Sequence, residues 1–111
     1  MNVTPEVGIA NILKAEGVEF VSTFPTNGVN NALGPAGVPL IMMRDDRYAI
    51  AMADAYARVN NGNKIGVATV MGGVNSAGVQ IAYGGIAQAY EDGSPLLVLA
   101  DGVPTGQSQN S

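Results

Sequence analysis

The residues best suited to chemistry in this chain form an acidic pair, Asp45 and Asp46, between Arg44 and Arg47. Asp favours the N-cap of a helix and the positive end of the helix dipole, so the pair has a purely structural explanation. The functional alternative is that one carboxylate faces a ligand while the two arginines keep it ionised. The chain contains no His and no Cys. Acid–base chemistry therefore falls to carboxylates, Tyr or Lys, and thiolate and imidazole metal sites are excluded.

A glycine-rich segment, residues 72–78, is the second candidate. Gly73 and Gly78 have the spacing of the phosphate-binding pattern G-x-x-x-x-G, but Val79 and Gln80 follow where Lys and Ser or Thr are required. The dinucleotide pattern G-x-G-x-x-G is also absent. The segment is therefore predicted to be a strand-to-helix turn, and weak anion binding by the free N–H groups of the helix N-terminus stays open.

The spacing of apolar residues predicts the elements that position these candidates. The predicted strands cover residues 18–24, 38–43, 65–71 and 95–100, and the predicted helices cover 5–16, 27–33, 46–60 and 79–90. Residues 34–37, GPAG, are expected to break the second helix, and residues 102–111 to form a loop or tail. Buried strands alternating with helices indicate a three-layer α/β/α fold with a mainly parallel sheet, in a single domain over residues 1–111.

The carboxyl ends of the predicted strands should meet at one edge of this sheet. The segments that follow them are residues 24–27, 44–47, 72–78 and 101–104, and they hold much of the Gly, Pro, Asn and Asp of the chain. Ligands bind beyond the carboxyl ends of strands in open parallel sheets. The sequence therefore predicts a candidate site along this edge, although loops have a similar composition without any ligand.

Charge and hydropathy exclude several classes of partner. The formal net charge is −4, and the five Lys and Arg residues are spread along the chain. Nucleic acid is therefore not an expected partner. The N-terminus lacks the pattern of a signal peptide, and no apolar run approaches the roughly 20 residues that span a bilayer. A cytoplasmic protein without a membrane segment is expected.

The stretch RDDRYAIAMADAYAR, Arg44 to Arg58, resembles the signature R-x-E-x-x-A-x-x-M-A-D-G-Y-A-R of thiamine diphosphate enzymes of the acetolactate synthase and pyruvate oxidase type. That signature lies in their N-terminal, pyrimidine-binding domain. ILKAEGVEFVSTFP and GGIAQAYEDGSPLLVLADGVP are similar to further segments of the same domain, in the same order. The resemblance extends from Gly8 to Pro104. It implies the thiamine diphosphate-binding fold, with this copy ending before the domain is complete.

The resemblance implies a catalytic role for Asp46. It aligns with a glutamate that hydrogen-bonds N1′ of the aminopyrimidine ring and favours the imino tautomer, which removes the C2 proton of the thiazolium. Asp is one methylene shorter, roughly 1.5 Å by bond geometry, so it reaches N1′ only if the helix sits closer or a water bridges the gap. Asp45 aligns one residue too early for this role.

The resemblance also implies cofactor-binding residues in two loops. Pro25, Thr26 and Asn27 align with the loop that lines the pyrimidine pocket. Gly78 is the one glycine kept from the pattern G-P-G-x-x-N, and Gln80 replaces a polar contact there. No metal ligands are predicted in this chain, because the G-D-G…N motif that holds Mg²⁺ and the diphosphate is absent from it.

Three functions follow as hypotheses. The first is the pyrimidine-binding half of a thiamine diphosphate-dependent lyase, transferase or oxidase that acts on a 2-keto acid. Its site would be completed by a second copy or by a diphosphate-binding domain or subunit, and the isolated chain would be inactive. The second is a non-catalytic structural or regulatory module that self-associates or binds an intact partner. The third is an unrelated nucleotide-binding domain, which the failed phosphate motifs disfavour.

Overall fold

The computed structural model describes residues 4–24, 28–72 and 78–100 of the chain. Four strands form one sheet in these residues, and every strand pair in it is parallel. The strands are β1 (Val21–Thr23), β2 (Leu40–Met42), β3 (Gly66–Val70) and β4 (Leu96–Ala100). The helices are α1 (Pro5–Ala15), α2 (Asn30–Ala36), α3 (Asp46–Val59) and α4 (Gly78–Glu91).

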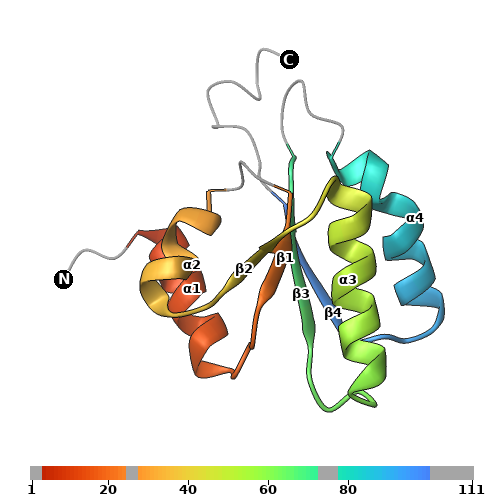
Figure 1. The fold of residues 1–111 in the computed structure, drawn as a ribbon, viewed down its shortest axis with the longest axis horizontal. Coiled ribbons are helices and arrows are strands. Elements are labelled where there is room, and N and C mark those ends of the chain that lie inside the picture. Colours follow the sequence, from red (N-terminus) through yellow and green to blue (C-terminus); the bar gives the residue numbers. More distant parts are fainter. Residues whose placement is uncertain (1–3, 25–27, 73–77, 101–111) are drawn as a thin grey trace.

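Helices α1 and α2 cover one face of the sheet and α3 and α4 cover the other (Figure 1). The strand order is β2-β1-β3-β4, so β1 and β3 are the central strands. All four strands run toward the upper edge in Figure 1, and α3 and α4 begin at that edge. The predicted three-layer α/β/α fold with a parallel sheet is confirmed.

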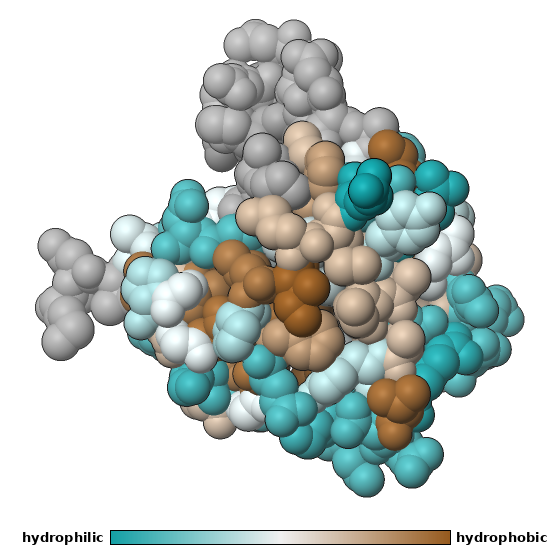
Figure 2. Space-filling view, viewed as in Figure 1, coloured by the Kyte–Doolittle hydropathy of each residue, from teal (hydrophilic) through white to brown (hydrophobic). Residues whose placement is uncertain are grey.

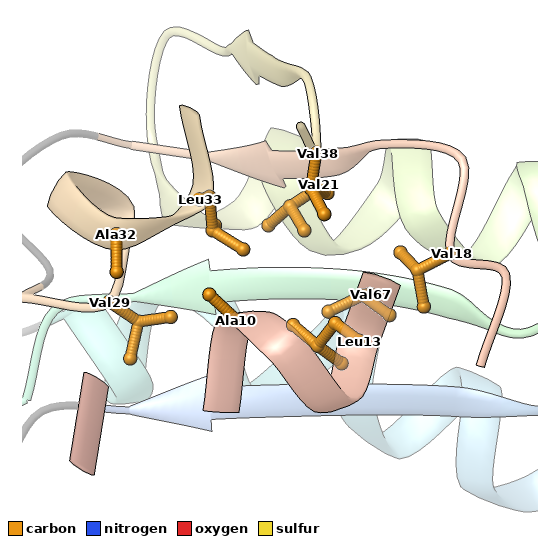
Figure 3. Packing of buried hydrophobic residues seen from close by; sticks show 9 residues of the cluster. All are labelled: Ala10, Leu13, Val18, Val21, Val29, Ala32, Leu33, Val38 and Val67. Carbon is orange, nitrogen blue, oxygen red and sulfur yellow. The ribbon is translucent and has the colours of Figure 1, made fainter. Parts of the chain in front are cut away.

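The hydrophobic core is divided by the sheet into two clusters. The cluster under α1 and α2 is built around Leu13, Val21, Leu33 and Val67 (Figure 3). The cluster under α3 and α4 is built mostly from small residues, with Ile50 as its largest fully buried side chain. Small side chains bring the layers close together, so backbone contacts matter more on this second face.

Alternation along β3 decides which residues face each cluster. All five residues of β3 are buried. Val67 belongs to the cluster under α1 and α2, whereas Ala68 and Val70 belong to the cluster under α3 and α4. Successive side chains of a strand point to opposite faces, so a fully buried strand must be covered on both sides. β3 thus forms the centre of the domain.

Two features of the N-terminal half differ in part from their prediction. The strand at residues 38–43 is predicted to be buried, but among the described residues β2 pairs with β1 alone and forms an edge of the sheet, with Ile41 and Met42 38% and 62% exposed. Figure 2 shows apolar side chains on the surface over this region. The run of residues 34–37 does end the second helix, but only at its last residue, because α2 continues through Pro35 to Ala36 and is capped by Gly37, where φ is +85°. Near the end of so short a helix, Pro35 removes only one helical hydrogen bond.

The apolar residues whose spacing predicts the fourth helix are buried only in part. Ala82 and Ala89 of α4 are buried, but Tyr83 and Tyr90 are 66% and 83% exposed. The strand at residues 95–100 is likewise not fully buried, since four residues of β4 are half-buried and Ala100 is exposed. The reason is position, because β4 pairs with β3 on one side only among the described residues.

Replacing Gly66 by Ala should destabilise the fold severely. A Cβ atom at Gly66 would overlap the backbone carbonyl of Ala53 in α3, and backbone atoms cannot move aside cheaply. We expect a loss of about 3 kcal/mol or more in the free energy of unfolding, measured by urea denaturation. Gly84→Ala is the matched control, because nothing lies within 4 Å of its Cβ position. That helical replacement should stabilise the chain by roughly 0.5–1 kcal/mol, and a comparable loss at both glycines would contradict the close-packing argument.

Candidate functional site

Asp45 is the N-cap of α3. Its backbone is extended, with φ −158°, and its carboxylate accepts a hydrogen bond of 3.0 Å from the backbone N–H of Tyr48. The guanidinium of Arg47 lies 3.4 Å from the same carboxylate. The Tyr48 N–H first, and Arg47 with it, lower the pKa of Asp45 below its usual range. The structural explanation of the acidic pair is therefore correct for Asp45.

Asp46, the first residue of α3, has a different environment. It is only 3% exposed, and its Oδ1 accepts a hydrogen bond of 3.2 Å from the backbone N–H of Met71, just beyond the end of β3. Burial raises the pKa of Asp46, and the charge of Asp45 adds to this, while the Met71 N–H opposes it. Of the two carboxylates, Asp45 is the one that pairs with Arg47, and the pKa of Asp46 owes its shift to burial and not to an arginine.

Gly78, at the start of α4, lies directly against this carboxylate. A Cβ atom at Gly78 would stand 2.7 Å from Oδ2 of Asp46 and would overlap the carbonyl oxygen of Met71. The structure therefore brings together two of the predicted site residues, Asp46 and Gly78, at the carboxyl edge of β3. Only glycine permits this close approach of α4 to the carboxylate.

Of the other predicted site residues, only Gln80 lies within the described part of the chain. Gln80 is exposed, two residues into α4 from Gly78. Pro25, Thr26 and Asn27 lie outside the described residues. The roles assigned to all of these residues stay predictions.

A buried polar cluster at the ends of the two central strands was not predicted from the sequence. Thr23 and Thr69 are fully buried, and their hydroxyl oxygens are 2.6 Å apart. The Asn30 amide donates to Thr23 Oγ1 at 2.9 Å, and Asn30 Oδ1 lies 2.9 Å from Thr69 Oγ1. The cluster joins β1, β3 and α2. A signal was available, because threonine stands at an inward position in both apolar runs.

The buried contact of Ser22 was not predicted from the sequence either. Its hydroxyl donates to the backbone carbonyl of Ala49 in α3 at 2.5 Å, and both residues are fully buried. Neighbouring residues of β1 thus serve opposite faces, with Thr23 bonded to α2 and Ser22 bonded to α3. The hydroxyl of Ser22 ties β1 to the same helix that begins with Asp46.

A second group of charged residues lies further along α3. Asp54 and Arg58, four residues apart on α3, form an ion pair of 2.9 Å, and Arg58 also contacts Asp92 at 2.9 Å. Asp54 is 7% exposed rather than on an open face. Burial alone would raise its pKa, but the hydrogen bond from Arg58 contributes to a net lowering. This group fastens α3 to the residues that follow α4, and it contains no site residue.

Two hollows lie elsewhere on the described surface. One, of about 490 Å³, lies between α1 and α2 and is lined by Glu6, Asn31 and Pro35 among others. The other, of about 570 Å³, runs beside Leu13, Lys64 and neighbouring residues. Asp46 lines neither of them. Within residues 4–24, 28–72 and 78–100, no group of three or more acidic side chains is placed to hold a metal ion.

The two adjacent aspartates should give opposite pH dependences. Folding raises the pKa of Asp46, so its contribution to the free energy of unfolding falls as pH rises through that raised value. Folding lowers the pKa of Asp45, so its contribution rises with pH and is lost on acidification through the lowered value. Urea unfolding of Asp46→Asn and Asp45→Asn between about pH 3 and pH 7 measures both effects.

Each asparagine keeps the hydrogen-bond acceptor and removes the charge, so Asp46→Asn should be at least as stable as the parent chain at neutral pH. Asp45→Asn should be less stable there, because its contact with Arg47 is weakened. For each variant, the difference in the free energy of unfolding from the parent chain is followed against pH. If this difference changed with pH in the same direction for both variants, the environments of the two aspartates would not differ as described.

Comparison with known proteins gives consistent matches. Residues 6–111 match the family model described as the thiamine pyrophosphate enzyme, N-terminal TPP binding domain. The chain is 31% identical over 96 residues to the acetolactate synthase large subunit of Haemophilus influenzae, covering 83% of this chain and 16% of that protein. It is 32% identical over 100 residues to the probable acetolactate synthase large subunit of Methanocaldococcus jannaschii, covering 87% and 16%.

A third relative carries a different name. The sulfoacetaldehyde acetyltransferase of Alcaligenes xylosoxydans xylosoxydans is 32% identical over 94 residues, covering 72% of this chain and 15% of that protein. The chain thus spans about one sixth of the length of the curated relatives it matches. No helix among the described residues is long and apolar enough to cross a membrane. The family match covers nearly the whole chain, so this chain belongs to the thiamine pyrophosphate enzymes, in the family of their N-terminal cofactor-binding domain.

Proposed function

We propose that this chain supplies the pyrimidine-binding half of a thiamine diphosphate site, in a cytoplasmic enzyme that acts on 2-keto acids. Asp46 is the carboxylate that contacts N1′ of the aminopyrimidine ring. The observation that carries the proposal is a buried carboxylate with a raised pKa at the edge of the sheet where ligands bind in parallel folds. It stands at the position of the family signature that the glutamate occupies.

The chemistry of this carboxylate fits an aminopyrimidine. A carboxyl group of raised pKa holds its proton more strongly and can share it with a weakly basic ring nitrogen. Bound thiamine diphosphate supplies a ring amine that takes up a proton and a thiazolium that accepts electrons. The chain orients Asp46 through the Met71 N–H and keeps water from it by burial.

Gly78 would admit the cofactor close to this carboxylate. Its missing side chain already lets the backbone approach Oδ2 of Asp46. Pro25, Thr26 and Asn27 are proposed to line the ring, and Gln80 to provide a polar contact. The Mg²⁺ ion and the diphosphate would be held by a separate diphosphate-binding domain, either on another subunit or elsewhere in a longer polypeptide.

The proposed reaction class is taken from the names of the matched proteins. Two of the matched proteins are named as acetolactate synthase large subunits or probable ones, and the third as an acetyltransferase. The two synthases support a transferase or lyase that acts on a 2-keto acid as the proposed reaction class. The partner is a second copy of the chain or a subunit carrying the diphosphate-binding domain.

One observation favours a second function. Oδ1 of Asp46 already accepts a hydrogen bond from Met71, so the carboxylate has a structural role of its own between α3 and β3. In a non-catalytic module, that role would be sufficient. The module would then bind or regulate an intact enzyme without contributing a carboxylate to its site.

Replacing Asp46 by Ala separates these two functions. In the enzyme assembled with its diphosphate-binding domain, Asp46→Ala should lower kcat by about 100-fold or more, the usual contribution of a positioned acid or base. Asp45→Ala is the matched control, because it removes the neighbouring carboxylate, with its N-cap and its contact with Arg47, but leaves Asp46 in place, at a cost of about 1 kcal/mol in stability. Thermal melting first shows that each variant is folded, and steady-state kinetics then measures kcat. Unchanged turnover in Asp46→Ala would favour the structural module.

The 111-residue chain alone should bind thiamine diphosphate weakly. Calorimetric titration with the cofactor and Mg²⁺ should give no stoichiometric binding at micromolar chain, because the diphosphate-binding half is supplied elsewhere. Adding the complementary domain should produce binding that Asp46→Ala weakens. Tight one-to-one binding by the chain alone would show that the half-site proposal is wrong.

A further inference from the structure

We propose that Ser22 is a positioning residue for Asp46, because it sets how deeply α3 sits against the sheet. This inference rests on the proposed function in giving Asp46 a ligand to reach. The effect of Ser22 on the position of Asp46 depends only on contacts within the chain, so it can be tested without cofactor.

The contact between Ser22 and Ala49 is the first step. The Ser22 hydroxyl donates to the Ala49 carbonyl at 2.5 Å, with both residues fully buried. The Ala49 N–H in turn donates to the carbonyl of Asp45 at 3.1 Å and so closes the first turn of α3. Ala49 therefore links this turn to Ser22 of β1. A carbonyl inside a helix already has a partner in the helical ladder. The hydroxyl is therefore not needed to satisfy it, and its effect is to hold β1 and α3 together.

Two glycines remove the steric limits on this approach. A Cβ atom at Gly66 of β3 would overlap the Ala53 carbonyl, and one at Gly85 of α4 would stand 2.9 Å from Ile50 Cγ2. No side chain therefore separates α3 from β3 at Gly66, and the Ile50 side chain of α3 packs directly on the backbone of α4 at Gly85. The glycines permit the close position, and Ser22 supplies a directed attraction that holds α3 in it.

The depth of α3 determines what Asp46 can reach. An aspartate side chain carries its carboxylate only two bonds from the backbone, and here it meets the Met71 N–H at 3.2 Å, near the upper limit of a hydrogen bond. A small outward movement of α3 would break that contact. The missing methylene, roughly 1.5 Å relative to glutamate, is offset by the depth of the helix.

The test is an NMR titration of the isotope-labelled 111-residue chain. In the parent chain, the Met71 amide shift should follow the titration of the Asp46 carboxyl, because the two groups are hydrogen-bonded. Ser22→Ala should remove most of this coupling and make the Met71 amide exchange with solvent roughly tenfold faster, as expected for one lost hydrogen bond. Asp46→Glu in the Ser22→Ala background should restore the coupling, since the longer side chain recovers the lost reach.

Thr69→Val is the matched control. It removes a buried hydroxyl from the neighbouring strand, on the face toward α2, and so should destabilise the chain without altering the coupling between Asp46 and Met71. Gly85→Ala is a second way to displace α3, because its methyl group would push against Ile50 from the side of α4. It should weaken the coupling even if Ser22→Ala folds poorly.

Three outcomes are informative. Loss of coupling in Ser22→Ala and Gly85→Ala, with rescue by Asp46→Glu, supports the positioning role. Coupling that persists in both variants, or that is lost equally in Thr69→Val, overturns it. If coupling is lost as expected but the assembled enzyme with Ser22→Ala keeps its cofactor affinity and kcat, Ser22 still positions Asp46 within the chain. In that case it is the proposed function of Asp46 that is wrong.

Discussion

The close contact between α3 and β3 is the constraint on which the rest of the domain depends. Gly66 has no side chain, so the carbonyl of Ala53 occupies the space where a Cβ atom would stand. With the backbones this near, the buried cluster on that face holds mostly alanine, and Ile50 is its largest fully buried side chain. The same proximity brings the N-terminus of α3 to the end of β3, where Met71 meets Asp46. A bulkier interface would separate the carboxylate from that backbone and expose it to water.

The acidic pair shows how environment, rather than residue type, assigns a role. Asp45 and Asp46 are identical neighbours, yet the pKa of one is lowered by a backbone N–H and Arg47, and the pKa of the other is raised by burial. The helix needs one carboxylate as a cap, and Asp45 fills that position in an exposed, ion-paired setting. Asp46 is thereby released from capping and is turned inward. The pair divides structural and chemical tasks between two adjacent positions.

The sequence was sufficient for the order and type of the elements, because strand runs and helical spacing are local properties. It was not sufficient for burial at the edges. The apolar residues of β2 gave the same pattern as a central strand, and only the strand order shows that Ile41 and Met42 are exposed. The Asp45 cap and the pair of Asp54 and Arg58 were predictable because they span three and four residues. The partners of Ser22 and Asp46 lie 27 and 25 residues away, so local spacing could not reveal them.

The strand order also governs how the chain reaches this structure. One strand and two helices separate β1 from its partner β3 in the chain, and the hydroxyl contact between Thr23 and Thr69 joins residues 46 positions apart. Closing so long a loop costs conformational entropy before any contact compensates for it, and folding slows as contacts become less local. The α3, β3 and α4 segments are consecutive and can associate early. The buried hydroxyls of β1 then select the correct register as the strand arrives, because a shift by one residue would place Ser22 and Thr23 on the wrong faces.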